Sequence, residues 1–257
     1  MSVLEAVLIA LAGVCAGTIN TIVGSGTLIT FPALIGFGYP PVVANISNNL
    51  GLVPGGVAGT WGYRSELRGQ SRLLKTLVPM SLIGSVAGAT ALLVLPAAAF
   101  DAVVPVLIAA SLMLVVTQPR IQARMKRIHE HTSGSGRIQH PALLRGGVLG
   151  AGIYGGYFGA AQGVLLLGLL GSLLPEDLQR INAAKNVLGT VVNFVAAVVF
   201  TVVAFDQVDW AVAGLISVGS VGGGLIGARV GRRLSPTLLR AVILAVGTAA
   251  IVRLLFT

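Results

Sequence analysis

The sequence predicts an all-α, polytopic membrane protein built from two inverted repeats. The chain has 257 residues, of which 55 % are hydrophobic and only 10 % are charged, and its mean hydropathy of +0.91 is too high for a soluble domain. Apolar runs of about 18 residues or more recur along its length, as in proteins that cross a membrane several times. The chain also repeats itself, because the polar cluster Asn45–Asn49 returns 137 positions later as Asn182–Asn186.

Hydropathy divides the chain into eight apolar segments, at 3–37, 41–62, 73–95, 100–117, 142–174, 178–205, 208–230 and 237–256. The first and the fifth are too long for one span, and each is interrupted by small residues, at Gly24–Gly26 and Gly159–Gly163. We therefore expect each repeat to be a broken-helix hairpin followed by three transmembrane helices, about ten helices in all. Whether each hairpin is re-entrant or forms two short spans is left open.

The repeats are expected to cover residues 1–117 and 142–257. Between them, 118–141 is a basic linker that contains Ser133-Gly134-Ser135-Gly136, and we expect it to be mobile and cytoplasmic. A second repeated feature is the pair Gly84 and Gly88, which returns 139 positions later as Gly223 and Gly227. Glycines four residues apart on a membrane helix predict close helix packing.

Loop charges predict the topology. The loops 63–75 and 229–240 are rich in Lys and Arg, whereas 96–101 and 204–210 contain Asp and no basic residue. Basic loops stay in the cytoplasm, so the first two loops lie inside and the other two outside. Equivalent loops of the two repeats thus fall on opposite sides, which predicts that the repeats are inverted in the inner (plasma) membrane. If each repeat begins with a hairpin, the N-terminus lies outside, whereas a single first span would put it inside.

The composition also excludes several classes of protein. The net charge of +9 comes from basic clusters in loops and does not indicate nucleic-acid binding. All eight carboxylates fall in loops or at segment ends, which argues against a cation or metal carrier. A single cysteine, Cys15, excludes an internal disulfide. With no His, Asp or Cys group inside the membrane, we expect no enzyme, no cofactor and no bound metal.

Two polar helical faces are the first candidates for a binding site. Each carries polar side chains at positions i, i+3 and i+4, which a helix places on one face. They comprise Asn45, Asn48 and Asn49 in the first repeat and Asn182, Lys185, Asn186 and Asn193 in the second. Lys185 is the basic residue most expected within a span, where it would attract an anion. The alternatives are that Lys185 snorkels or pairs with Asp177, and that the asparagines only join helices.

The helix breaks are the second group of candidates. Where a helix restarts, its first N–H groups lack intrahelical partners and carry the positive end of the dipole. Two restarts that face each other would cradle an oxyanion; the alternative is a tight hairpin whose small residues only permit close approach. The residues concerned are Asn20, Thr21, Gly24, Ser25, Gly26 and Thr27 at the first break, and Gln162 and Gly163 at the second.

The chain resembles the TauE/SafE family of sulfite exporters and sulfonate permeases. The likeness rests on Gly13-(x3)-Gly17-(x2)-Asn20-(x3)-Gly24-Ser25-Gly26, on Gly38-Tyr39-Pro40-Pro41, and on Val208-Asp209-Trp210 followed by Gly223-(x3)-Gly227-Ala228-Arg229. The resemblance implies transport of sulfite, sulfonate or sulfoacetate-like anions, whereas the residues themselves indicate only an anion. The second break departs from the family pattern, because Ala160-Ala161-Gln162 replaces a fuller glycine run.

We therefore expect a secondary transporter that works by alternating access. Its partners would be a small anionic substrate and the lipid bilayer, with no nucleic acid. An anion channel, and a membrane enzyme or assembly component that does not transport, remain as alternatives. The coupling ion, the direction of transport and a homodimeric state are left open.

Overall fold

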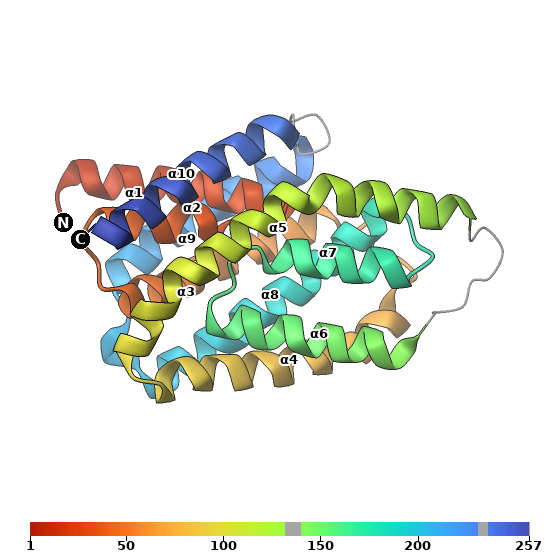
Figure 1. The fold of residues 1–257 in the computed structure, drawn as a ribbon, viewed down its shortest axis with the longest axis horizontal. Coiled ribbons are helices and arrows are strands. Elements are labelled where there is room, and N and C mark those ends of the chain that lie inside the picture. The colour runs from red at the N-terminus through yellow and green to blue at the C-terminus, as the bar shows by residue number, and fades with distance from the viewer. Residues whose placement is uncertain (132–139, 231–235, 257) are drawn as a thin grey trace.

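The computed structural model describes residues 1–131, 140–230 and 236–256 (Figure 1). Within these ranges the chain forms ten α-helices, one short 3-10 helix and no strand, so the predicted all-α fold of about ten helices is confirmed. The helices are α1 (Val3–Ile22), α2 (Thr27–Gly36), α3 (Pro41–Gly62), α4 (Ser71–Val94), α5 (Ala97–His131), α6 (Pro141–Tyr157), α7 (Gln162–Leu173), α8 (Leu178–Val203), η1 (Phe205–Gln207), α9 (Trp210–Val230) and α10 (Pro236–Phe256).

Five helical stretches are long and apolar enough to cross a membrane. They are Val3–Ile22, Ser71–Val94, Ala97–Ala123, Leu178–Val203 and Trp210–Val230. The helices α2 and α7 are apolar but only 10 and 12 residues long, which at about 1.5 Å per residue reaches roughly half-way through a bilayer. These lengths identify the chain as a multi-pass membrane protein with short, broken helices.

Both long apolar segments fold as helical hairpins, at the predicted breaks. The first splits into α1 and α2, and the Tyr39 hydroxyl beyond α2 donates to Glu5 Oε1 (3.0 Å) in the first turn of α1. The fifth splits into α6 and α7, where a Cβ on Gly147 would touch Leu169 and a Cβ on Gly155 would touch Gln162. In each hairpin the second helix therefore runs back along the first.

The helix α5 is longer than the sequence predicts. It continues as far as His131 and so includes the first half of the predicted linker. Residues 120–131 contain no glycine or proline and many good helix formers, which explains why the helix extends beyond the apolar segment. The flexible-looking motif Ser133–Gly136 lies outside the described residues.

The packing of the two halves is symmetric. Each half has five helices, so α1 to α5 are equivalent, in order, to α6 to α10. The contact of α1 with α9 then corresponds to the contact of α6 with α4, and the contact of α3 with α9 corresponds to that of α8 with α4 (Figure 1). In the same way, α2 packs on α10 and α7 packs on α5. Exchanging each helix for its equivalent in the other half thus reproduces the main helix pairs, which is the pattern that a two-fold relation between the halves would give.

The repeated glycine pairs make the closest of these contacts. A Cβ on Gly84 or Gly88 would lie 2.4 Å from Leu149 O or 2.0 Å from Ile153 O of α6. A Cβ on Gly223 would likewise lie 2.1 Å from Val14 O of α1. No side chain fits at such distances, so glycine is required for α4 to reach α6 and for α9 to reach α1, and the prediction of close packing is confirmed.

The equivalent helices α3 and α8 run antiparallel across the centre of the molecule. Ser47 Oγ accepts from the Asp209 N–H (2.9 Å) just beyond the end of α8, and Thr60 Oγ1 lies 3.2 Å from Thr190 Oγ1. Beyond the end of α3, Gln70 Nε2 donates to Arg180 O (3.0 Å) near the start of α8. A two-fold axis between antiparallel helices is perpendicular to them, which is the arrangement an inverted repeat requires. The sidedness of the repeats in a membrane stays a prediction.

The topology can be tested by labelling single cysteines in a Cys15→Ala background. Val3 is 84 % exposed at the start of α1, and a cysteine there leaves the Ser2–Glu5 capping box intact. We expect Val3→Cys to react with a membrane-impermeant maleimide in intact spheroplasts. A matched cysteine at the exposed Ser71, in the basic loop, should react only after permeabilisation. Protection of Val3→Cys until permeabilisation would contradict the predicted topology.

Candidate functional site

The tips of the two hairpins touch each other. The Gly163 N–H, at the start of α7, donates to Gly24 O (3.0 Å) in the break between α1 and α2. A Cβ on Gly24 would lie 2.3 Å from Gly163 Cα, and a Cβ on Gly163 would lie 2.4 Å from Gly24 Cα. Because the two-fold relation exchanges the hairpins, this backbone contact lies close to the axis, where the two repeats meet.

The two tips share one left-handed glycine and differ at the residue that precedes the second helix. Gly24 has φ 87°, a left-handed value that glycine adopts readily. Gly159 has the same place after α6 and a φ of 78°. Ala161, which immediately precedes α7, has φ 58°, whereas Gly26, which immediately precedes α2, has φ −57°. A side chain in the left-handed region costs about 1–2 kcal/mol. The departure from a glycine run at the second break therefore places a strained alanine before α7, at a point where the two tips differ in backbone conformation.

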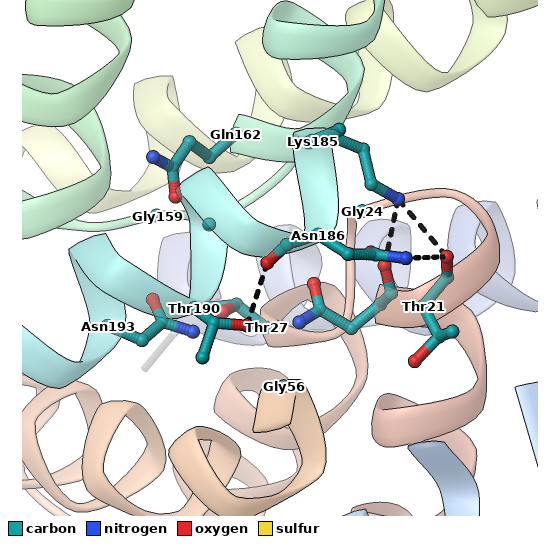
Figure 2. A pocket seen from close by; sticks show the side chains of 13 residues that line it. Thr21, Gly24, Thr27, Gly56, Gly159, Gln162, Lys185, Asn186, Thr190 and Asn193 are labelled. Atoms are coloured by element: carbon teal, nitrogen blue, oxygen red, sulfur yellow. Dashed lines mark hydrogen bonds between the residues drawn. The ribbon is translucent and has the colours of Figure 1, made fainter. Parts of the chain in front are cut away.

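A small cavity lies beside the tips. It encloses about 20 Å³, which is room for about one water molecule. It is bordered by the end of α1, the start of α2, the loop and first residues of α7, and one face of α8, with Gly56 of α3 opposite (Figure 2). Its lining residues are Asn20, Thr21, Gly24, Thr27, Gly56, Gly159, Gln162, Gly163, Lys185, Asn186, Gly189, Thr190 and Asn193.

Nine of the fifteen residues predicted for the site line this cavity: Asn20, Thr21, Gly24, Thr27, Gln162, Gly163, Lys185, Asn186 and Asn193. The other six do not, namely Ser25, Gly26, Asn45, Asn48, Asn49 and Asn182. Four lining residues were not predicted: Gly56, Gly159, Gly189 and Thr190. Gly189 and Thr190 lie one helical turn after Lys185 and Asn186, so extending the polar face of α8 would have found them.

Lys185 is buried and holds the broken end of α1. Only 2 % of the residue is exposed, and its Nζ donates to Asn20 O and Thr21 O, both at 3.2 Å (Figure 2). Since α1 ends at Ile22, these are carbonyls that lack partners within the helix and carry the negative end of its dipole. Among the described residues Lys185 forms no ion pair, so it neither snorkels nor pairs with Asp177.

Two asparagines of α8 strengthen the same contact. Asn186 Nδ2 donates to Thr21 O at 3.3 Å and Asn182 Nδ2 donates to it at 3.4 Å. The first repeat has a matching arrangement, in which Asn45 of α3 donates to Tyr157 O (3.0 Å), the last residue of α6. In each half, therefore, an amide caps the broken helix of the other half.

The symmetry fails at the charged position. The counterpart of Lys185 is Asn48, whose Nδ2 donates to Thr27 Oγ1 (3.3 Å) and whose Oδ1 accepts from the Thr30 hydroxyl. Asn48 is thus engaged with side chains of α2. The polar cavity lies to one side of the axis, and its positive charge comes from the second repeat alone.

Several donors at the cavity have no protein partner. Gln162 is 4 % exposed, and its Nε2 makes no hydrogen bond within the described part of the chain. The side-chain amides of Asn20 and Asn193, which are half-buried, also make no hydrogen bond within the described part of the chain. A buried donor without an acceptor costs about 1–3 kcal/mol. These donors and the Lys185 ammonium suit an anion, and the described residues contain no cluster of His, Cys, Asp or Glu that could hold a metal.

A bundle of apolar helices in which two broken hairpins meet beside a polar cavity is the architecture of a membrane transporter. The chain belongs to the TauE/SafE family, because the family model described as "Sulfite exporter TauE/SafE" matches residues 9–254. This confirms the resemblance drawn from the glycine and asparagine motifs.

Curated relatives are similar over nearly the full length. The "Probable membrane transporter protein YfcA" of Escherichia coli K12 is 26 % identical over 94 % of this chain and 86 % of its own length. The "Probable membrane transporter protein" of Haemophilus influenzae is 25 % identical over 90 % of this chain and 87 % of its own. The "Probable membrane transporter protein ORF9" of Sinorhizobium sp is 28 % identical over 95 % of this chain and 90 % of its own length. No solved structure matches the chain.

The tip contact predicts opposite effects for two small substitutions. Gly24→Ala introduces a Cβ into the Gly163 backbone at a left-handed position and should destabilise the protein by about 3 kcal/mol or more. Ala161→Gly removes a strained side chain and should stabilise it by about 0.5–1 kcal/mol. Thermal unfolding of the purified proteins in detergent measures both; equal effects of the two changes would show that the tips do not adopt this geometry.

The unpartnered amide of Gln162 gives a further prediction. Gln162→Met removes a buried donor and should raise the unfolding temperature by a few degrees, about 1 kcal/mol, while anion transport falls. Gln118 of α5 is a matched control, because its Oε1 is also buried without a partner but lies away from the cavity. Gln118→Met should leave transport unchanged. The assignment of Gln162 to the anion site fails if Gln162→Met and Gln118→Met both transport like the wild type.

Proposed function

We propose that this protein is a secondary carrier that moves small sulfur-containing anions across the inner (plasma) membrane by alternating access. The observation that carries the proposal is the buried Lys185 ammonium beside unpartnered amide donors at the contact of the two hairpin tips. We assign no catalytic role to any residue. The names of the curated relatives support transport in general, and the family description supports sulfite as one member's substrate.

The electrostatics of the cavity favour an anion. In its protonated form Lys185 places a full positive charge where water is scarce, and such a charge is costly unless an anion or oriented dipoles balance it. The helix-end carbonyls of Asn20 and Thr21 balance it only in part, since they amount to about half an elementary charge. An oxyanion in the cavity would complete the neutralisation and accept from Gln162, Asn20 and Asn193.

The size of the cavity favours a carrier over a channel. About 20 Å³ leaves room for little more than one water molecule, so we expect substrate binding to widen the cavity. We propose that the tips separate to make this room, which would break the hydrogen bond from Gly163 N–H to Gly24 O. Because one tip belongs to each repeat, substrate binding is coupled to a relative movement of the two repeats, as alternating access requires.

Flux into proteoliposomes that contain only this protein tests the proposal. We expect saturable uptake of one or more compounds from a panel of the anions sulfite, sulfate, thiosulfate and sulfoacetate and the zwitterion taurine, and no uptake of chloride. Lys185→Met should reduce this flux by about tenfold or more, because an anion would lose its counter-charge. The exposed Lys75 of the basic loop offers a matched control, and Lys75→Met should transport normally.

The outcomes distinguish the candidate functions. Saturable flux that depends on Lys185 supports the carrier and its site. Flux that does not saturate indicates a channel. An absence of flux for every anion, from protein that elutes as a folded particle, would contradict the proposed function.

A further inference from the structure

We propose that the cavity selects a singly charged oxyanion, and that binding transfers the Lys185 ammonium from the α1 carbonyls to that anion. This inference rests on the proposed function and adds the charge of the substrate to it. It is drawn from the contacts of Lys185 and from the charges that surround the cavity.

The cavity holds one formal charge. Of the thirteen lining residues that the structure describes, Lys185 alone is charged. The helix ends beside Lys185 contribute partial charges of both signs. The helix α1 directs its negative end to the cavity, while α2 and α7 direct their positive ends there. The other charges on α8 and on the helices packed against it do not line the cavity. The helices α3 and α7 have no charged residue, Arg180 lies in the first turn of α8, and Asp206 lies in η1 beyond the far end of α8. The remaining charges, Arg72, Lys75 and Arg145, lie near the starts of α4 and α6.

The contacts of Lys185 are arranged so that it can leave them. Thr21 O accepts from three donors, and two of them, Asn182 and Asn186, remain if Lys185 moves away. Only Asn20 O loses the one side-chain donor that it has among the described residues. A charged oxygen is a stronger acceptor than a carbonyl, so an anion in the cavity would draw the ammonium toward itself. In the empty site, therefore, the carbonyl oxygens at the end of α1 accept the hydrogen bonds that Lys185 would otherwise donate to the anion.

If the Lys185 ammonium moves from the α1 carbonyls to the anion, the charge of the anion must match the single charge of Lys185. A singly charged anion beside Lys185 leaves the interior neutral. A doubly charged anion leaves one negative charge without a partner in a medium of low dielectric constant, which is strongly unfavourable. The free amides of Gln162, Asn20 and Asn193 supply hydrogen bonds in both cases and therefore do not discriminate between the two anions.

Methanesulfonate and sulfate form the test pair, because both are tetrahedral and similar in size but differ by one charge. We expect methanesulfonate to inhibit sulfite flux in proteoliposomes at a concentration about tenfold or more below that required for sulfate. It should also raise the unfolding temperature of the purified protein more than sulfate does at equal ionic strength. In Lys185→Gln both anions should act weakly and equally.

A variant with an added charge tests the same idea without removing the lysine. Asn193 lines the cavity, so Asn193→Lys should shift the preference toward sulfate, whereas the neutral Asn193→Gln should keep the preference for methanesulfonate. If the two anions inhibit the wild-type flux equally, or if sulfate inhibits it more strongly, the selection of a singly charged anion is wrong. The proposed carrier function is not affected by that result. A preference that persists in Lys185→Gln would overturn the role of Lys185. If no anion is transported at all, the proposed function itself fails, and this inference fails with it.

Discussion

A helix that ends inside a membrane protein leaves backbone carbonyls that must find hydrogen-bond donors, and this requirement links the fold to the site. The helix α1 ends near the centre of the bundle, and its last carbonyls accept from Lys185, Asn182 and Asn186 of α8. The end of α6 accepts in the same way from Asn45 of α3. Each half therefore supplies the donors that the broken helix of the other half needs, so neither half is complete alone.

The same requirement explains how a structural contact can become a binding site. Donors that cap a helix end are already desolvated, directed at oxygen atoms and held in position by the packing around them, and an oxyanion presents similar oxygen atoms with more charge. In the first repeat the counterpart of Lys185, Asn48, is engaged by Thr27 and Thr30 of the same repeat. The second repeat replaces that asparagine with Lys185 and keeps a cavity beside it. A symmetric scaffold thus carries an asymmetric site, and the asymmetry depends mainly on one residue.

Much of the fold could be predicted from the sequence, because hydropathy and glycine act locally. The breaks after α1 and α6 fall where small residues interrupt apolar segments that are too long for one span, and the pairs at Gly84 and Gly223 make the contacts that their spacing predicts. The site could be predicted less completely. Spacing places Asn45 and Asn182 on polar faces, but only the packing decides that they cap helices outside the cavity. Gly56 carries no side-chain signal at all and borders the cavity because α3 crosses α8 there.

The position of Lys185 with and without substrate is the most direct test of this account. Electron cryomicroscopy of the protein in lipid nanodiscs, alone and with a saturating transported anion, would measure it. The account predicts that in the empty protein the Lys185 Nζ lies on the carbonyls of Asn20 and Thr21, and that in the loaded protein the anion lies between Nζ and Gln162 with the hairpin tips apart. An anion bound elsewhere, with Lys185 still on the α1 carbonyls and the tips in contact, would contradict it.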